Sequence, residues 1–89
     1  MNIDEFSQKL NEHFVKAKNE WVAVDVIGIS YSVDVTIVSD KVNDREESNK
    51  YIEECFNSLE EKYNKGIIEL YTSEEAEFYG IQKRENFFI

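Results

Sequence analysis

Residues 21–39 read WVAVDVIGISYSVDVTIVS and decide the fold. Apolar side chains alternate with small or polar ones in both halves of this stretch, which is the period of a β-strand. The two halves have opposite parity, because the valines are even-numbered before Ile27-Gly28 and the apolar residues are odd-numbered after it. The chain must therefore turn at this dipeptide, and the stretch predicts an antiparallel hairpin.

A two-residue loop at Ile27-Gly28 would put these apolar side chains on one face of the hairpin. The pairs that it predicts are Val26 with Ile29, Val24 with Tyr31, and Val22 with Val33. The other face is half polar, which is typical of an antiparallel sheet with helices on one face only. We therefore expect the hairpin of residues 21–39 to form one layer and the helices to form the other.

A helix is predicted before the hairpin, over residues 3–18. Its apolar residues recur at spacings of three and four, so they form one stripe along the helix. Asn2 and Glu5 have the spacing of a capping box, which would satisfy free N–H groups in the first turn. The helix is therefore expected to begin directly after Asn2.

A second helix is predicted over residues 44–64. Asp44 and Glu47 have the same capping-box spacing, and Gly66 lies where helices commonly stop. The apolar side of this helix comprises Ile52, Cys55, Phe56, Leu59 and Tyr63. That side is expected to pack on the hairpin.

The C-terminal part of the chain predicts smaller elements. Residues 67–71 indicate a short strand, and Ser73 starts a capped short helix that ends near Gly80. Residues 86–89 fit either a closing strand or an apolar tail that packs in a groove. The order α-β-β-α-β-(short α)-(β) predicts an α+β two-layer sandwich, with residues 1–89 forming one domain.

Net charge limits the partners that the chain can have. Its 89 residues include 19 acidic and 10 basic side chains, which gives a formal net charge of −9. This charge repels phosphate backbones and anionic lipid headgroups, so neither direct nucleic-acid binding nor membrane binding is expected. It can attract a basic protein and speed its association, or it can simply keep a small protein soluble.

Cysteine content and apolar runs indicate the compartment. Cys55 is the only cysteine, so the chain has no internal disulfide and no cysteine cluster for zinc or iron. The first twenty residues carry many charges, and no apolar run is long enough for a membrane span. We expect a cytoplasmic protein that needs no cofactor.

The most distinctive pattern is a heptad repeat of paired glutamates in the predicted second helix. At about 100° per residue, the six side chains project from the arc opposite the apolar one. They are Glu46, Glu47, Glu53, Glu54, Glu60 and Glu61. A basic partner lying along this face would relieve their mutual repulsion, and the alternative is an ordinary solvated helix face.

A second acidic cluster lies at the start of the predicted short helix. Its members are Glu74, Glu75 and Glu77. Negative charge here complements the helix dipole, so capping alone explains the cluster. If the short helix lies near the long one, both clusters would form a single anionic surface for a basic partner.

No motif predicts a catalytic residue or a metal site. His13 and Cys55 both lie at or near the apolar stripes of their helices, so a Cys-His pair is conceivable. A cysteine among bulky apolar neighbours is more typical of an inert core residue. The three glycines are scattered, so no phosphate-binding loop is present either. The chain is not expected to be an enzyme.

Trp21 is the remaining candidate for a binding residue. The predicted hairpin places it on the more polar face, beside small side chains that would leave it prominent. An exposed tryptophan of this kind can mark a protein interface or a homodimer contact. The alternative is that the C-terminal segment Phe87-Phe88-Ile89 folds over it.

In size, charge and expected architecture the chain resembles small acidic proteins that block other macromolecules, such as toxin-immunity proteins and phage-encoded inhibitors of nucleases or defence enzymes. The resemblance is one of composition and involves no motif. It implies a non-enzymatic protein-binding module that docks a basic protein surface through its acidic helix. The alternative hypothesis is a structural or regulatory subunit that forms homo-oligomers through the Trp21 face.

Overall fold

The structure is a computed structural model and describes residues 1–88, without the side chain of Phe88. Three α-helices and four strands succeed one another along the chain. In chain order they are α1 (Ile3–Phe14), β1 (Trp21–Ile27), β2 (Ser32–Val38), the 3₁₀ turn η1 (Asp40–Asn43), α2 (Arg45–Ser58), β3 (Asn64–Tyr71), α3 (Ser73–Tyr79) and β4 (Phe87–Phe88). The α+β class predicted from the sequence is confirmed.

The strands form one mixed sheet in the order β3-β2-β1-β4. β1 and β2 are antiparallel, as the hairpin prediction requires. β3 pairs parallel to β2, and β4 pairs parallel to β1. The β2–β3 connection runs through α2, and a crossover of that length returns the chain to the starting end of β2, which makes β3 parallel.

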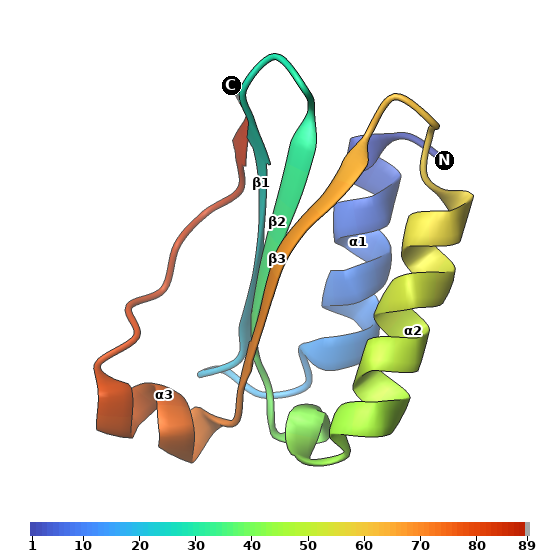
Figure 1. Cartoon of the computed structure of the whole chain (residues 1–89). Helices are drawn as coiled ribbons and strands as arrows, with labels where there is room; N and C mark the ends of the chain where they lie inside the picture. The colour runs from blue at the N-terminus through green and yellow to red at the C-terminus, as the bar shows by residue number, and fades with distance from the viewer. Residues whose placement is uncertain (89) are drawn as a thin grey trace.

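The helices lie on both faces of the sheet, with the two long ones together on one face (Figure 1). α1 and α2 enclose the main core against the sheet. This core includes Phe6, Leu10, Phe14, Val24, Val33, Val35, Ile37 and Ile52. The short helix α3 lies on the opposite face of the sheet. The expectation that the helices lie on one face only therefore holds for α1 and α2 but not for α3.

The hairpin register differs from the predicted one. Val26 pairs with Val33 rather than with Ile29, so the loop contains the four residues 28–31 instead of two. The shift is an even number of residues, and therefore the apolar side chains stay on the same face. Gly28 and Tyr31 both have positive φ, at 73° and 52°, which is the backbone that this wider turn requires. Ile29 is fully exposed at its tip.

The first helix is shorter than predicted because its exit loop is held by a buried carboxylate. α1 begins as expected, with the complete capping box of Asn2 and Glu5. It ends at Phe14, and Glu20 Oε1 accepts hydrogen bonds from the N–H groups of Lys16 and Ala17 at 2.7 and 2.9 Å. Since those two N–H groups are satisfied by a side chain, the loop does not need helical bonds.

The second helix is also shorter than predicted, which matters for the acidic row. α2 ends at Ser58 rather than at residue 64, and Leu59 is extended and buried. The N-terminal amino group donates to the Ser58 carbonyl, and Glu60 N–H donates to the Met1 carbonyl at 3.0 Å. The chain terminus thus satisfies backbone groups where the helix stops, and the chain turns toward β3.

The segment after α3 crosses the outer face of the sheet, meaning the face opposite α1 and α2. Arg84 forms an ion pair with the buried carboxylate of Asp25 at 2.7 Å and donates to Thr36 Oγ1 at 2.6 Å. Asn86 Oδ1 accepts from Val24 N–H at 3.0 Å. Phe87–Phe88 then forms the closing strand, which resolves the alternative of strand or tail for these residues, and Ile89 lies outside the described residues.

A bulge in β3 depends on Gly66. The β2–β3 register shifts between Val33 and Val35, and a Cβ at Gly66 would stand 2.1 Å from Asp34 Oδ1 and 2.8 Å from the Val33 carbonyl oxygen. The same Asp34 oxygen accepts from Ile67 N–H at 2.8 Å. A side chain at position 66 would therefore separate β3 from β2 or break this bond.

We predict that Gly66→Ala lowers the free energy of unfolding by about 1–3 kcal/mol, because the added methyl group overlaps backbone and a bonded carboxylate. Urea unfolding followed by circular dichroism measures this loss. The matched control is Gly28→Ala, which meets no atom within 4 Å and bears only the cost of a positive φ, about 1 kcal/mol. An unchanged urea midpoint for Gly66→Ala would contradict the close approach.

Candidate functional site

The glutamates of α2 are only partly arranged as predicted. Glu46, Glu47, Glu53 and Glu54 all lie on the exposed side of this helix. Glu60 and Glu61 are exposed too, but they follow the end of the helix. The predicted row of six glutamates on one continuous helix is therefore wrong, because the chain turns at Leu59, and four of the six remain on the helix.

These four glutamates form two files, each with a spacing of seven residues. Glu53 contacts Lys65, so the file of Glu46 and Glu53 borders β3. The other file borders α1, because Glu47 and Glu54 line a hollow of about 230 Å³ together with His13 and Tyr51. One helix thus presents carboxylates along both of its margins.

Few of these carboxylates form an ion pair. Glu53 is paired with Lys65, and Glu60 lies 4.0 Å from Lys62. Both pairs are solvent-exposed, and such pairs contribute only about 0–1 kcal/mol. Within residues 1–88, no ion pair involves Glu46, Glu47, Glu54 or Glu61. Lys50 lines the hollow beside Glu47 and Glu54, but it forms no ion pair with either of them among the described residues.

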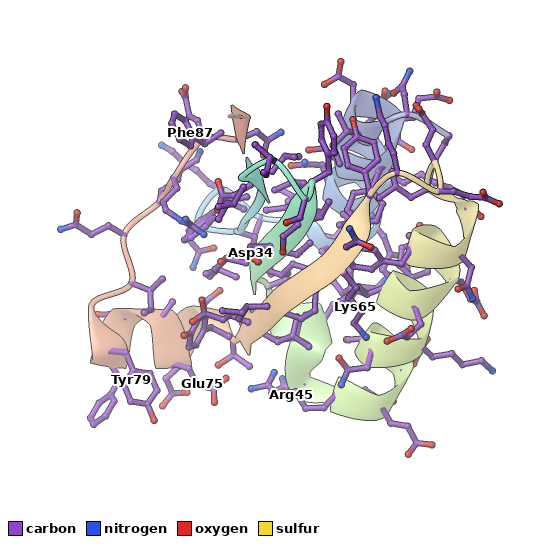
Figure 2. All side chains as sticks on the ribbon, turned by 45° about the horizontal axis from the view of Figure 1, so that its top comes forward. Asp34, Arg45, Lys65, Glu75, Tyr79 and Phe87 are labelled. Atoms are coloured by element: carbon purple, nitrogen blue, oxygen red, sulfur yellow. The ribbon has the colours of Figure 1, made fainter. Side chains whose placement is uncertain are left out.

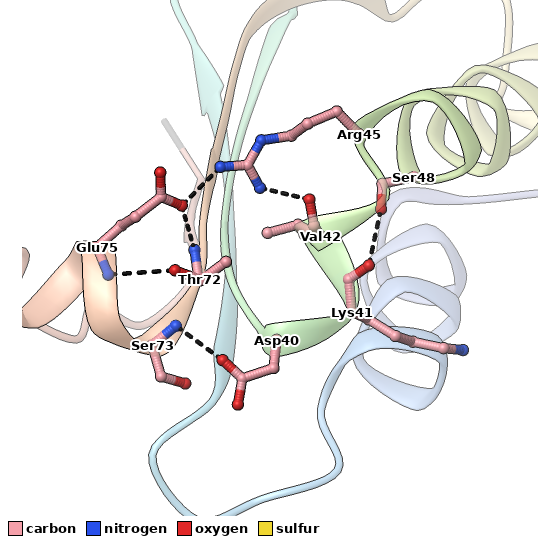
Figure 3. A network of polar contacts seen from close by, with 8 residues as sticks. All are labelled: Asp40, Lys41, Val42, Arg45, Ser48, Thr72, Ser73 and Glu75. Carbon is pink, nitrogen blue, oxygen red and sulfur yellow. Dashed lines mark hydrogen bonds and ion pairs between the residues drawn. The ribbon is translucent and has the colours of Figure 1, made fainter.

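The second acidic cluster adjoins the first (Figure 3). Arg45, the first residue of α2, forms an ion pair with Glu75 of α3 at 2.6 Å and also donates to the Val42 carbonyl. Thr72 and Glu75 form a capping box, which fixes the start of α3 beside α2. The Thr72 N–H and then Arg45 hold the pKa of Glu75 below its usual value. The sequence alone does not show whether the short helix lies near the long one. The Arg45–Glu75 pair shows that the first turns of α2 and α3 are adjacent.

Two exposed aromatic residues accompany this junction. Phe78 and Tyr79 are 82% and 63% exposed, and their rings meet edge to face at 5.1 Å. They line a surface hollow of about 380 Å³ together with Arg45, Glu74 and Glu75. Neither residue was predicted from the sequence. Phe78 lies two residues after the buried Ala76, which places it off the packed side of α3. Tyr79 lies three residues after Ala76, a spacing typical of the same side, so the helical period could have indicated only Phe78.

The remaining member of the second cluster, Glu77, is exposed on the same short helix. We use the name acidic side for the surface formed by the exposed carboxylates of α2 and α3. Its members are Glu46, Glu47, Glu53, Glu54, Glu74, Glu75 and Glu77.

The prediction that Trp21 is prominent on the sheet is wrong. Trp21 is only 6% exposed and packs with Ala23, Val38 and Ala76 in a second apolar cluster. Ala76 belongs to α3, and Ile81 of the following segment packs against the same cluster. The cover thus includes α3 and the segment after it, whereas the expected cover was residues 87–89.

His13 and Cys55 do not form a nucleophile and base. The ring of Tyr51 stacks on His13 at 3.6 Å, and Tyr51 is also the residue that interacts with Cys55. Burial raises the pKa of the Cys55 thiol, which is opposite to the shift that a nucleophilic thiolate needs. Burial and then Lys41 lower the pKa of His13.

No group of three or more histidine, cysteine, aspartate or glutamate side chains within residues 1–88 is placed to hold a metal ion. Among the helices that the structure describes, none combines the length and the apolar character needed to cross a bilayer.

We predict that Cys55 in the folded chain reacts with iodoacetamide at least about tenfold more slowly than in urea, because the thiol is buried and its pKa is raised. Mass spectrometry of timed samples at neutral pH measures both rates. Equal rates would contradict the inert, buried position.

Comparison with known proteins gives no relative from which to infer a function. No protein-family model matches the chain, and no curated protein or solved structure is similar enough to it to count as a match.

Proposed function

We propose that this chain is a non-enzymatic binding module whose acidic side docks on a basic protein surface. The observation that carries the proposal is the Arg45–Glu75 pair, since it holds the first turn of α3, with Glu74 and Glu75, beside the first turn of α2, with Glu46 and Glu47. The formal net charge of −9 supports the same choice of partner. A basic surface would be attracted over a distance of about one Debye length, roughly 8–10 Å at moderate salt.

The exposed aromatic residues Phe78 and Tyr79 add apolar contact area to this charged surface. Charged rims mainly set association rate and partner choice, whereas buried aromatic anchors supply much of the affinity in protein interfaces. Phe78 and Tyr79 stand beside the carboxylates of Glu74 and Glu75. A lysine or arginine side chain of the partner that entered this hollow would meet both an aromatic face and negative charge.

The proposed consequence of binding is inhibition. A module that covers a basic surface prevents that surface from contacting its own anionic ligand. This is the mode of action expected for an inhibitor or immunity protein. The alternative of a homo-oligomer associating through Trp21 loses its basis, because α3 and Ile81 cover that residue.

We predict that the triple variant Glu46→Lys, Glu53→Lys and Glu54→Lys loses the basic partner of the wild-type chain. Immobilised protein is incubated with extract of the native host, and the retained proteins are eluted with increasing NaCl. Wild type should retain a basic protein that elutes as salt screens the contact, and the variant should retain about tenfold less, a loss of about 1.4 kcal/mol in binding.

The control is the triple variant Asp4→Lys, Glu12→Lys and Glu85→Lys, which changes the net charge by the same amount at exposed positions of α1 and of the segment after α3. It should retain the partner as wild type does. Equal retention by both triple variants, or no basic protein on the wild-type chain, would overturn the proposal. Circular dichroism confirms that both variants are folded.

A further inference from the structure

One edge of the sheet is open along eight residues. The order β3-β2-β1-β4 leaves β3 without a neighbour on its outer edge among the described residues, whereas the opposite edge is formed by β4, which has only two residues. An edge strand of this length presents a row of free N–H and C=O groups. Such an edge can accept a further strand from another chain.

The direction of the free groups follows from two hydrogen bonds. Ile67 N–H donates to Asp34 of β2, and the Tyr71 carbonyl accepts from Ser39 N–H directly after β2. Odd-numbered residues of this part of β3 therefore direct their backbone groups toward β2. Because backbone direction alternates along a strand, Ile68 and Leu70 direct their N–H and C=O groups away from the sheet.

The two sides of this edge differ in chemistry. On the helix side, the file of Glu46 and Glu53 runs alongside β3, and Figure 2 shows Lys65 between the strand and α2. On the outer face, Ile67 is 64% exposed, and Glu69 beside it accepts a hydrogen bond from the Tyr71 hydroxyl at 2.7 Å. At the end of β3, Tyr79 and the Arg45–Glu75 pair lie together. An added strand would thus meet the file of Glu46 and Glu53 on the α2 side. On the outer face it would meet Ile67 beside a carboxylate that is bonded to Tyr71.

We infer that the partner contributes an extended segment that adds to β3 as an antiparallel strand, with basic side chains on the α2 side and apolar side chains on the outer face. This inference rests on the proposed function and specifies its binding mode. Lys65 of this chain already pairs with Glu53, so Glu46 and the formal net charge of −9 are what select a basic segment. A second copy of this acidic chain would instead bring like charge to the edge. Antiparallel pairing is the more stable arrangement for each residue.

The geometry fixes which backbone groups of the partner are used. In an antiparallel pair, residues that exchange both hydrogen bonds have their side chains on the same face. Ile68 and Leu70 face the α2 side, because both pack against the core there. The partner residues that bond to them must therefore be the basic ones, and the backbone groups of the apolar residues point away from β3.

The test uses three synthetic peptides, titrated into the ¹⁵N-labelled chain and followed by NMR. The probe is acetyl-(Lys-Val)₄-amide. The first control carries a methyl group on the backbone nitrogen of every lysine, and the second carries one on the backbone nitrogen of every valine. We expect the probe and the valine-methylated peptide to bind alike and to protect the amides of Ile68 and Leu70 from exchange. Methylation at lysine should weaken binding about tenfold, since it removes at least one to two hydrogen bonds.

Each other outcome contradicts the inference. All three peptides could bind equally well, and the double variant Glu46→Lys with Glu53→Lys could weaken the binding of all three. That result would leave the acidic side as the binding surface and would overturn strand addition. Loss on methylation at valine instead of lysine would overturn the antiparallel arrangement. Failure of the probe to bind would overturn strand addition, whereas the proposed function is judged separately by the capture experiment. Protected amides in a sedimenting dimer of the free chain would show that a second copy occupies the edge.

Discussion

The parallel pairing of β3 with β2 is the constraint on which the rest of the structure depends. It requires the chain to leave β2, return along the helix side through α2 and then descend as β3. The return leaves β3 at the edge of the sheet with α2 beside it. α3 follows β3 directly, so its first turn lies next to the first turn of α2, where Arg45 and Glu75 meet. The acidic side is a product of this connection.

Local sequence patterns predicted which helices and strands form better than they predicted where these elements end. The alternation in residues 21–39 established the hairpin, and the caps at Asn2 and Asp44 marked the starts of both long helices. The hairpin register was wrong because a four-residue loop preserves the same parity, so periodicity alone cannot choose between the two. The end of α2 was missed because it depends on Met1, a contact between residues far apart in the sequence.

The candidate site was predictable only where it lies on one helix. Spacing placed Glu46, Glu47, Glu53 and Glu54 on the exposed side of α2, and the structure agrees. Hydrophobic periodicity within one element does not predict how elements pack against one another. It therefore could not indicate that α3 lies beside α2, that α3 covers Trp21, or that the outer edge of β3 is open. Glu60 and Glu61 do not belong to the helical row, because the helix ends at the buried Leu59, before these two residues.

The proposed binding mode combines charge with strand geometry: the carboxylates of the acidic side would select a basic partner, and the outward backbone groups of β3 would hold it. The most direct measurement is amide hydrogen exchange of the free chain, resolved by NMR along β3. We expect fast exchange at Ile68 and Leu70 and slow exchange at Glu69 and Tyr71, whose N–H groups face β2. Slow exchange at all four, or the reverse alternation, would contradict it, because the edge would then be covered or turned.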